Sequence, residues 1–129
     1  KKFLSIFKDQ LPKTLFDKCT SYKLVCKELK EKEVEEFNFK FLPKGDRKKA
    51  CAFAKLKQIE RLFNGSWTAN WKDNNQYKYY PWFDAGPGGR VFGSADCPGC
   101  FPASAAYFKD NETATFVGQT FIEIYKDLL

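Results

Sequence analysis

The chain of 129 residues has a formal net charge of +6, with 22 lysine and arginine residues against 16 acidic residues. It is long enough for one domain with its own core, and no apolar run approaches the roughly 18 residues of a membrane span. We therefore expect a single domain over residues 1–129 and no membrane partner. Histidine is absent, and neither a phosphate-loop pattern nor a dinucleotide fingerprint occurs. These absences remove the commonest catalytic chemistries, and we expect a non-catalytic protein without a cofactor.

The positive charge is concentrated in the first half of the chain. Residues 1–60 hold 16 basic and 9 acidic residues, whereas residues 61–129 hold 6 and 7. Such an excess is typical either of a solvated lysine-rich surface or of a protein that attracts nucleic acid, nucleotides or another acidic partner. Both interpretations stay open at this point.

Five cysteines occur at irregular spacing, which argues against a disulfide framework and fits a reducing cytoplasm. Cys97 and Cys100 form a CPGC motif, for which a redox pair, a zinc site and an ordinary turn are the three interpretations. A redox pair lacks the preceding βαβ unit, and Pro102 stands where its helix should run. Zinc would need two further ligands from cysteines on helix faces at non-motif spacing: Cys19, Cys26 and Cys51. We therefore favour a turn with two thiols and no metal.

Apolar periodicity and capping residues predict three helices. The first starts at the N-cap Thr14 and repeats apolar residues at three- and four-residue steps: Leu15, Cys19, Tyr22, Cys26 and Leu29. The second runs roughly over residues 46–63, from Asp46 to a stop at Asn64-Gly65. The third follows Asp110 and presents one apolar face almost to the C-terminus: Phe116, Val117, Thr120, Phe121, Ile124 and Leu128. Residues 1–12 are predicted to be a flexible basic arm or a first helical turn.

Three short segments between the second and third helices are predicted to be strands: YKYYPWFD, RVFGS and SAAYF. The GPGG run at 86–89 supplies a turn between the first two, and Pro81 makes the first an edge strand or splits it. The expected fold class is therefore α+β: two N-terminal helices, a small antiparallel sheet of short aromatic-rich strands and a C-terminal amphipathic helix.

Aromatic residues are unusually frequent, with 14 Phe, 6 Tyr and 3 Trp. In a strand, Tyr79 and Pro81 point to one side and Tyr80 and Trp82 to the other, so one of the two sets should lie in the core. We expect Trp82 and Phe83 to be buried rather than displayed. The aromatic density therefore indicates first a core and second a binding surface.

The segments AKLKQIERLFNGSWTANWKDNNQYKYYPWFD and VGQTFIEIYKDLL resemble a family of small proteins, with no assigned activity, from gut Bacteroidales and the phages that infect them, including crAss-like phages. The resemblance covers roughly residues 13–129, and the NQYKYYPWF motif and the tail are its most specific parts. The stretch CPGCFPASAAYF departs from the family pattern, so the CPGC motif looks particular to this chain. The resemblance implies a phage or mobile-element setting, in the bacterial cytoplasm or on a virion, and it implies no activity.

We expect a small phage-type accessory protein that binds an anionic ligand, most simply nucleic acid or a nucleotide. Lysines would supply charge, aromatic rings would stack on bases, and Arg90 in its glycine-rich segment would clamp a phosphate. The expected ligand-binding residues are Lys48, Lys49, Lys55, Trp67, Trp71, Lys72, Tyr77, Lys78, Tyr80 and Arg90. The alternative is a protein-interaction module, either a virion component or an inhibitor of a host defence protein, whose aromatic residues form binding hot spots. A homo-oligomer is also open.

Overall fold

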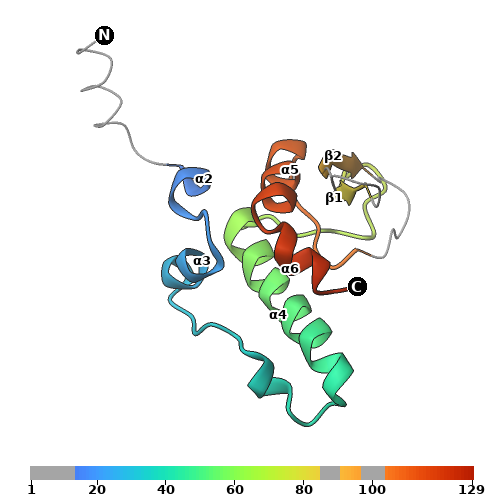
Figure 1. Cartoon of the computed structure of the whole chain (residues 1–129). Helices are drawn as coiled ribbons and strands as arrows, with labels where there is room; N and C mark the ends of the chain where they lie inside the picture. The colour runs from blue at the N-terminus through green and yellow to red at the C-terminus, as the bar shows by residue number, and fades with distance from the viewer. Residues whose placement is uncertain (1–13, 85–90, 97–103) are drawn as a thin grey trace, which may run out of the picture.

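The structure is a computed structural model that describes residues 14–84, 91–96 and 104–129 (Figure 1). Its elements follow the chain as α2 (Leu15–Lys18), α3 (Tyr22–Leu29), the short 3-10 helix η1 (Glu36–Phe39), α4 (Lys44–Asn64), β1 (Tyr79–Phe83), β2 (Val91–Asp96), α5 (Asn111–Thr120) and α6 (Ile122–Lys126). α4 is the longest element, and α3, η1 and α6 pack against it (Figure 1). None of the described helices is long and apolar enough to cross a membrane. The predicted arm at residues 1–12 lies outside the described residues.

The predicted first helix divides into two short helices. Thr14 caps α2 as expected: its side chain accepts a hydrogen bond from the Asp17 amide, and the Asp17 carboxylate accepts one from the Thr14 amide, both at 3.3 Å. A second cap follows at Ser21, whose hydroxyl accepts from the Leu24 amide at 3.3 Å and starts α3. α3 ends at Lys30, which has a left-handed backbone with φ of 59°. Serine is a strong N-cap residue, so Ser21 explains the division.

α4 begins at Lys44, two residues before the predicted start at Asp46, and ends where predicted. Asn64 is its last residue, and Gly65 has a φ of 58°, a conformation that glycine adopts without strain. One stripe of the helix is almost fully buried, through Leu56, Ile59 and Phe63. This stripe faces α5 and α6 and forms the centre of the core.

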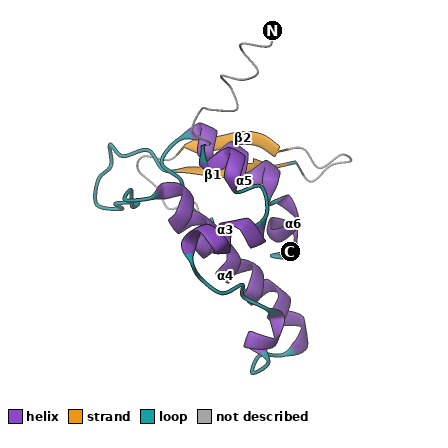
Figure 2. Cartoon of the chain, turned by 90° about the vertical axis from the view of Figure 1, so that its left-hand side faces the viewer, coloured by secondary structure: helices purple, strands orange, loops and turns teal. Residues whose placement is uncertain are grey.

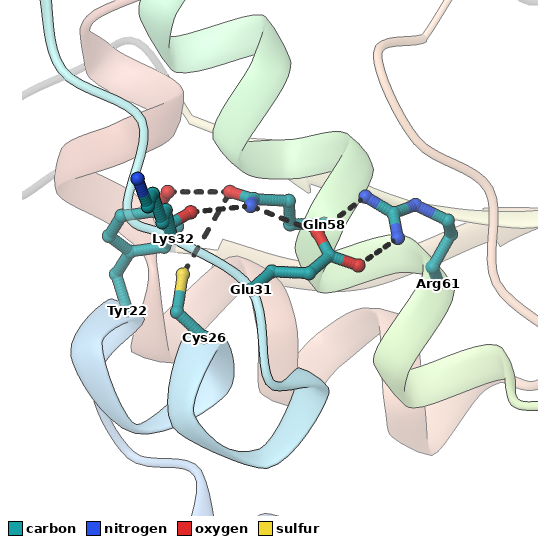
Figure 3. A network of polar contacts seen from close by, with 6 residues as sticks. All are labelled: Tyr22, Cys26, Glu31, Lys32, Gln58 and Arg61. Carbon is teal, nitrogen blue, oxygen red and sulfur yellow. Dashed lines mark hydrogen bonds and ion pairs between the residues drawn. The ribbon is translucent and has the colours of Figure 1, made fainter.

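A polar network joins another side of α4 to α3 and to the segment that follows α3 (Figure 3). Gln58 is 5% exposed; it accepts from the Tyr22 hydroxyl at 2.5 Å and donates to the Glu31 carboxylate and the Lys32 carbonyl, both at 3.1 Å. Arg61 forms a two-point ion pair with Glu31, with contacts of 2.5 and 3.0 Å. Burial raises the pKa of Tyr22, and the Arg61 guanidinium lowers the pKa of Glu31. The network fixes the segment after α3 along α4.

The predicted α+β class is wrong, because helices dominate the described structure and the predicted sheet of several strands does not form. In the part of the chain that the structure describes, strand pairing is confined to one antiparallel ribbon of β1 and β2 (Figure 2). The third predicted strand, SAAYF, contributes a single isolated bridge between Tyr79 and Phe108. Its failure to extend has a physical reason: both backbone groups of Tyr107 bond to side chains of α4 and are not available for a strand ladder.

The core is built around four phenylalanine rings, three from α2, α4 and α5 and one from the junction between α5 and α6. Phe16 of α2 stacks on Phe116 of α5, with 4.6 Å between ring centroids. Phe63 of α4 lies 5.6 Å from Phe116 and 6.3 Å from Phe121. We call these four rings the phenylalanine cluster. They hold α2, α4 and the C-terminal helices together without any polar contact of their own.

The predicted C-terminal helix also divides into two. Asp110 caps it as expected, because its carboxylate accepts a hydrogen bond from the Thr113 amide at 2.7 Å. The division falls at Phe121, which has a φ of −110° and is 3% exposed. Burial of the Phe121 ring in the core accompanies the change of direction between α5 and α6.

Candidate functional site

Five aromatic side chains from three separate segments gather along one side of the molecule. Trp71 and Tyr107 meet edge to face, with ring centroids 4.8 Å apart and an interplanar angle of 80°. Tyr80 lies 6.1 Å from Tyr107 in a similar geometry. Trp67 lines the same groove as Trp71 and Tyr107, and Trp82 follows Tyr80 on the outer face of β1. We call Trp67, Trp71, Tyr80, Trp82 and Tyr107 the aromatic strip.

Trp82 corrects the expectation that it lies in the core. It is 63% exposed, whereas Phe83 packs on the core with its ring 4.8 Å from that of Tyr125. The alternation of the strand holds: Tyr79 also packs against the core, and Tyr80 and Trp82 share the other side. The expectation of a core position therefore holds for Phe83 and is wrong for Trp82.

The last turn of α4 positions Tyr107 through side-chain hydrogen bonds. Asn64, only 6% exposed, donates to the Tyr107 carbonyl at 2.8 Å and accepts from the Lys109 amide at 3.2 Å. The Glu60 carboxylate accepts from the Tyr107 amide at 2.7 Å. The Tyr107 hydroxyl accepts from the Ser104 amide, also at 2.7 Å. Tyr107 is thus held at both backbone groups and at its ring, which gives the strip a rigid centre.

The loop between α4 and β1 is held by its own polar side chains. Gln76 accepts from the Asn70 amide at 2.6 Å and donates to the Thr68 carbonyl at 3.1 Å. Asp73 accepts from the Asn75 amide at 2.9 Å. Asparagine and aspartate side chains commonly close loops in this way. The bonds set the positions of the two tryptophans that the loop carries.

A groove of about 320 Å³ opens beside the strip at the C-terminal end of α4. Its cations are already paired, Lys57 with Glu60 at 3.3 Å and Arg61 with Glu31. Because a helix C-terminus carries partial negative charge, the groove is unfavourable for a phosphate. It suits a flat group with hydrogen-bonding edges. The lining residues are Lys57, Glu60, Arg61, Asn64, Gly65, Trp67, Thr68, Ala69, Trp71 and Tyr107.

Lys78, which was expected to contact a ligand, is an internal residue. It is 1% exposed, its ammonium donates to the Asp73 carbonyl at 2.9 Å, and it lies 5.1 Å from the centroid of the Trp71 ring. Its charge is therefore directed at the loop backbone and at one face of Trp71. In this structure Lys78 supports the strip and does not present its ammonium to solvent.

The expected lysines of α4 lie apart from the strip. Lys48 forms an ion pair with Asp127 at 3.4 Å, and the Lys55 ammonium lies 5.0 Å from the centroid of the Tyr22 ring. Lys49 is exposed. At a rise of 1.5 Å per residue, Lys48 lies about 24 Å along the helix from its C-terminal end. A nucleotide-sized ligand cannot touch both ends, so the expected residues do not form one compact site.

The remaining expected residues fall on the loop or outside the described chain. Lys72 is exposed, and Tyr77 is 49% exposed with its ring 6.4 Å from that of Tyr79. Both lie on the segment that carries the strip. Three residues, namely Arg90 and the CPGC cysteines Cys97 and Cys100, lie outside the described residues.

Sequence reasoning missed Tyr107 and misplaced Trp82. The SAAYF segment that contains Tyr107 has the alternation of a strand, and nothing local in it indicates a link to α4. The link is made across 43 or more positions by Asn64 and Glu60. For Trp82, the signal was available in the two-residue repeat that places it beside Tyr80.

The three described cysteines make separate structural contacts. Cys26 donates weakly to Gln58 and Cys51 to the Val34 carbonyl, while Cys19 lies near the Leu24 carbonyl. Burial raises the pKa of all three thiols, which disfavours the thiolate that metal binding or redox chemistry requires. Within residues 14–84, 91–96 and 104–129, no group of three or more cysteine or acidic side chains is placed to hold a metal ion.

Comparison with known proteins gives no information on the function of the chain. No protein-family model, no curated protein and no solved structure matches the chain. The resemblance to proteins of gut Bacteroidales and their phages gains no support from these comparisons and stays an expectation.

Proposed function

We propose that the chain is a small non-catalytic accessory protein that binds single-stranded nucleic acid through the aromatic strip. One observation carries the proposal: rings from the 67–71 loop, from β1 and from residue 107 meet in one strip beside a groove of about 320 Å³. Proteins that bind single strands use such rows of rings because every base offers a flat face for stacking. The setting in a phage-infected bacterial cytoplasm, or on a virion, belongs to the same proposal.

The groove suits bases, and the phosphates would lie outside it. The helix C-terminus and the Glu60 carboxylate disfavour an anion inside, whereas the exocyclic amines of bases can donate to such acceptors. Lys72 and Lys109 are exposed cations on the two segments that carry Trp71 and Tyr107. Two phosphate contacts predict a shallow salt dependence for a single strand, with a log–log slope of about −1.4.

A stripe along the outer face of α4 extends the proposed surface beyond the groove. Lys49, Phe53 and Lys57 lie four residues apart and so share one side of the helix. Phe53 is 47% exposed, and the Lys57 ammonium lies 5.3 Å from the centroid of its ring. Since Lys57 also lines the groove, a strand that leaves the groove along this side would meet a ring and then Lys49.

A protein-interaction module is the second candidate function, and the exposure of Trp82 favours it. A tryptophan that is 63% exposed on the outer face of a strand is the kind of anchor that dominates protein interfaces. In that case binding would depend on Trp82 and respond little to salt, whereas nucleic acid binding would respond to salt and to several rings of the strip.

Fluorescence anisotropy of a labelled oligo-dT strand tests the proposal directly. We expect the wild-type chain to bind at low salt, and Trp67→Ala and Trp82→Ala each to weaken binding about tenfold, as loss of one stacked base does. Phe41→Ala is the control, because it removes a ring that is 77% exposed at a distant place and should leave binding unchanged. A thermal melt of each variant shows whether the fold is kept.

Two outcomes would overturn the nucleic acid proposal. One is an absence of binding by the wild-type chain at low salt, where phosphate contacts are strongest. The other is equal loss of affinity in Phe41→Ala and in the strip variants. A mononucleotide ligand would then be sought by thermal shift, and the protein-interaction candidate would become the leading one.

A further inference from the structure

η1 and the segment that joins it to α4 lie at the end of the molecule remote from the β1–β2 ribbon (Figures 1 and 2), and they carry exposed phenylalanine side chains. Phe37 is 67% exposed and Phe41 is 77% exposed, although phenylalanine is normally among the most buried residues. Phe39 and Leu42 are half-buried beside them. We call residues 37–44 the phenylalanine tip.

The backbone of the tip is anchored at both ends. Arg47 of α4 reaches back along the loop and donates through Nε to the Leu42 carbonyl at 2.9 Å and through Nη2 to the Lys40 carbonyl at 3.0 Å. At the other end, the Glu35 amide donates to the Asn38 side chain at 2.8 Å and closes the first turn of η1. The exposed rings therefore project from a hydrogen-bonded loop.

The tip is cationic as well as apolar. Residues 37–44 contain two lysines and no acidic residue, and the exposed acids Glu35, Glu36 and Asp46 lie outside the tip on either side. The Lys40 ammonium lies 4.6 Å from the centroid of the Phe37 ring, and Lys44 is exposed at the start of α4. The Arg47 guanidinium is occupied by backbone carbonyls. The charges that the tip offers to a partner are therefore compact ammonium groups beside exposed rings.

We propose that the phenylalanine tip binds the surface of an anionic phospholipid bilayer. The rings enter the boundary between head groups and acyl chains, and the ammonium groups of Lys40 and Lys44 contact lipid phosphates. Other occupants fit less well. A second copy of the tip would bring like charges together, lysine is depleted at protein interfaces, and recognition of a single phosphate favours the two-point geometry of arginine. Point charges around protruding rings match a diffuse anionic surface.

Binding of this kind needs no membrane-spanning segment. The expectation of no membrane partner came from the lack of a long apolar run, and that lack concerns only proteins that cross the bilayer. The tip lies far from the groove and the strip, so the two proposals do not depend on each other. A chain with both surfaces could hold a nucleic acid close to a membrane.

Co-sedimentation of the full chain with vesicles tests the tip. The vesicles contain equal parts of phosphatidylglycerol and phosphatidylcholine, and vesicles of phosphatidylcholine alone serve as the neutral control. We expect the wild-type chain to bind the anionic vesicles at low salt and to stay in solution with the neutral ones. The double variant Phe37→Ala with Phe41→Ala should bind about tenfold less, and Lys40→Glu with Lys44→Glu should lose binding.

Trp82→Ala is the matched control, because Trp82 is also a strongly exposed ring but lies on the β1–β2 ribbon. It should bind vesicles like the wild-type chain. The proposal is overturned if the wild-type chain stays in solution with anionic vesicles, or if the double phenylalanine variant sediments as fully as the wild type. It is also overturned if the tip variants lose oligo-dT binding instead, since the tip would then be a second nucleic acid contact.

Discussion

The phenylalanine cluster and the aromatic strip use the same class of side chain in two different ways. In the cluster, four rings contact one another across α2, α4 and the C-terminal helices, and Phe63 is 2% exposed. In the strip, tryptophan and tyrosine rings lie half-buried or exposed beside polar loops and a groove. Phenylalanine has no polar atom, whereas the other two rings carry one that prefers a wet or hydrogen-bonded place. In these two regions, ring chemistry separates the aromatic side chains that hold the fold from those available to a ligand.

The largest effect should come from the cluster. Phe63→Ala leaves a cavity between α4 and α5, and we expect the free energy of unfolding to fall by about 3–5 kcal/mol. Urea denaturation at neutral pH measures the change. Phe41→Ala is the matched control, because its ring is 77% exposed and its removal should alter stability by at most about 0.5 kcal/mol. Equal losses in the two variants would contradict the assignment of Phe63 to the core.

The hydrogen bonds that link the two regions should make an intermediate contribution to the free energy of unfolding. Asn64→Ala leaves the Tyr107 carbonyl and the Lys109 amide without their partner, which costs about 1–3 kcal/mol for buried groups. Because the same bonds position Tyr107, affinity for oligo-dT should fall with stability. Asn74→Ala, at an exposed loop position, is the control and should change neither quantity. Unchanged binding by Asn64→Ala would show that Tyr107 does not belong to the site.

The Glu31–Arg61 pair lies outside both aromatic regions. Its removal therefore shows how much a polar contact of α4 contributes to the free energy of unfolding. Hydrogen bonds from Arg61 and then Gln58 lower the pKa of Glu31 in the folded chain. Its contribution is therefore present above the ordinary glutamate pKa of about 4.3 and is lost as the pH falls through the lower folded value. For a half-exposed pair we expect Glu31→Gln to cost less than about 1 kcal/mol at pH 7.

The measurement is the difference in unfolding free energy between wild type and Glu31→Gln as a function of pH. The difference should shrink below the ordinary glutamate pKa, about 4.3. Glu33→Gln, at an exposed position close by, is the control for the loss of one carboxylate charge from the same segment. A difference that grows on acidification would mean that the sign of the pKa change is wrong.

The smallest effect on stability should come from the strip. Trp82→Ala removes a ring that is 63% exposed, and we expect the free energy of unfolding to change by at most about 0.5 kcal/mol. Intrinsic tryptophan fluorescence and urea denaturation report it together. A loss as large as that of Phe63→Ala would place Trp82 in the core and would remove it from the proposed surface.

Local signals in the sequence predicted the ends of helices well. Thr14 and Asp110 are caps as expected, and Asn64-Gly65 ends α4, because each depends on hydrogen bonds within a few residues. The same rule applied to Ser21 would have found the break between α2 and α3. These boundaries are therefore readable from short windows, whereas the start of α4 at Lys44 and the division at Phe121 were not predicted.

The fold class and the positions of the site residues depend on contacts between distant segments, which a short stretch of sequence does not contain. The fold class failed because Tyr107 bonds to α4 instead of joining a sheet. Lys78 was expected to supply charge to a ligand, yet it is buried, and its ammonium contacts a carbonyl of its own loop and the Trp71 ring. Of the candidate site, the sequence indicated Trp67, Trp71 and Tyr80 as a group. Of the expected lysines of α4, Lys48 and Lys49 lie near the other end of the helix and Lys55 lies near its middle.

The hydrogen bonds from α4 to Tyr107 also bear on where the protein opens locally. The Tyr107 amide is held by the side chain of Glu60, and the Tyr107 ring is only half-buried, whereas Ile59 lies fully buried inside α4. Segments with fewer buried apolar contacts open at a lower free energy than core helices do. The strip should therefore be among the first parts of the protein to open, so amide exchange at Tyr107 should be faster than at Ile59. A ligand that binds the strip would therefore stabilise a part of the protein that opens easily without it.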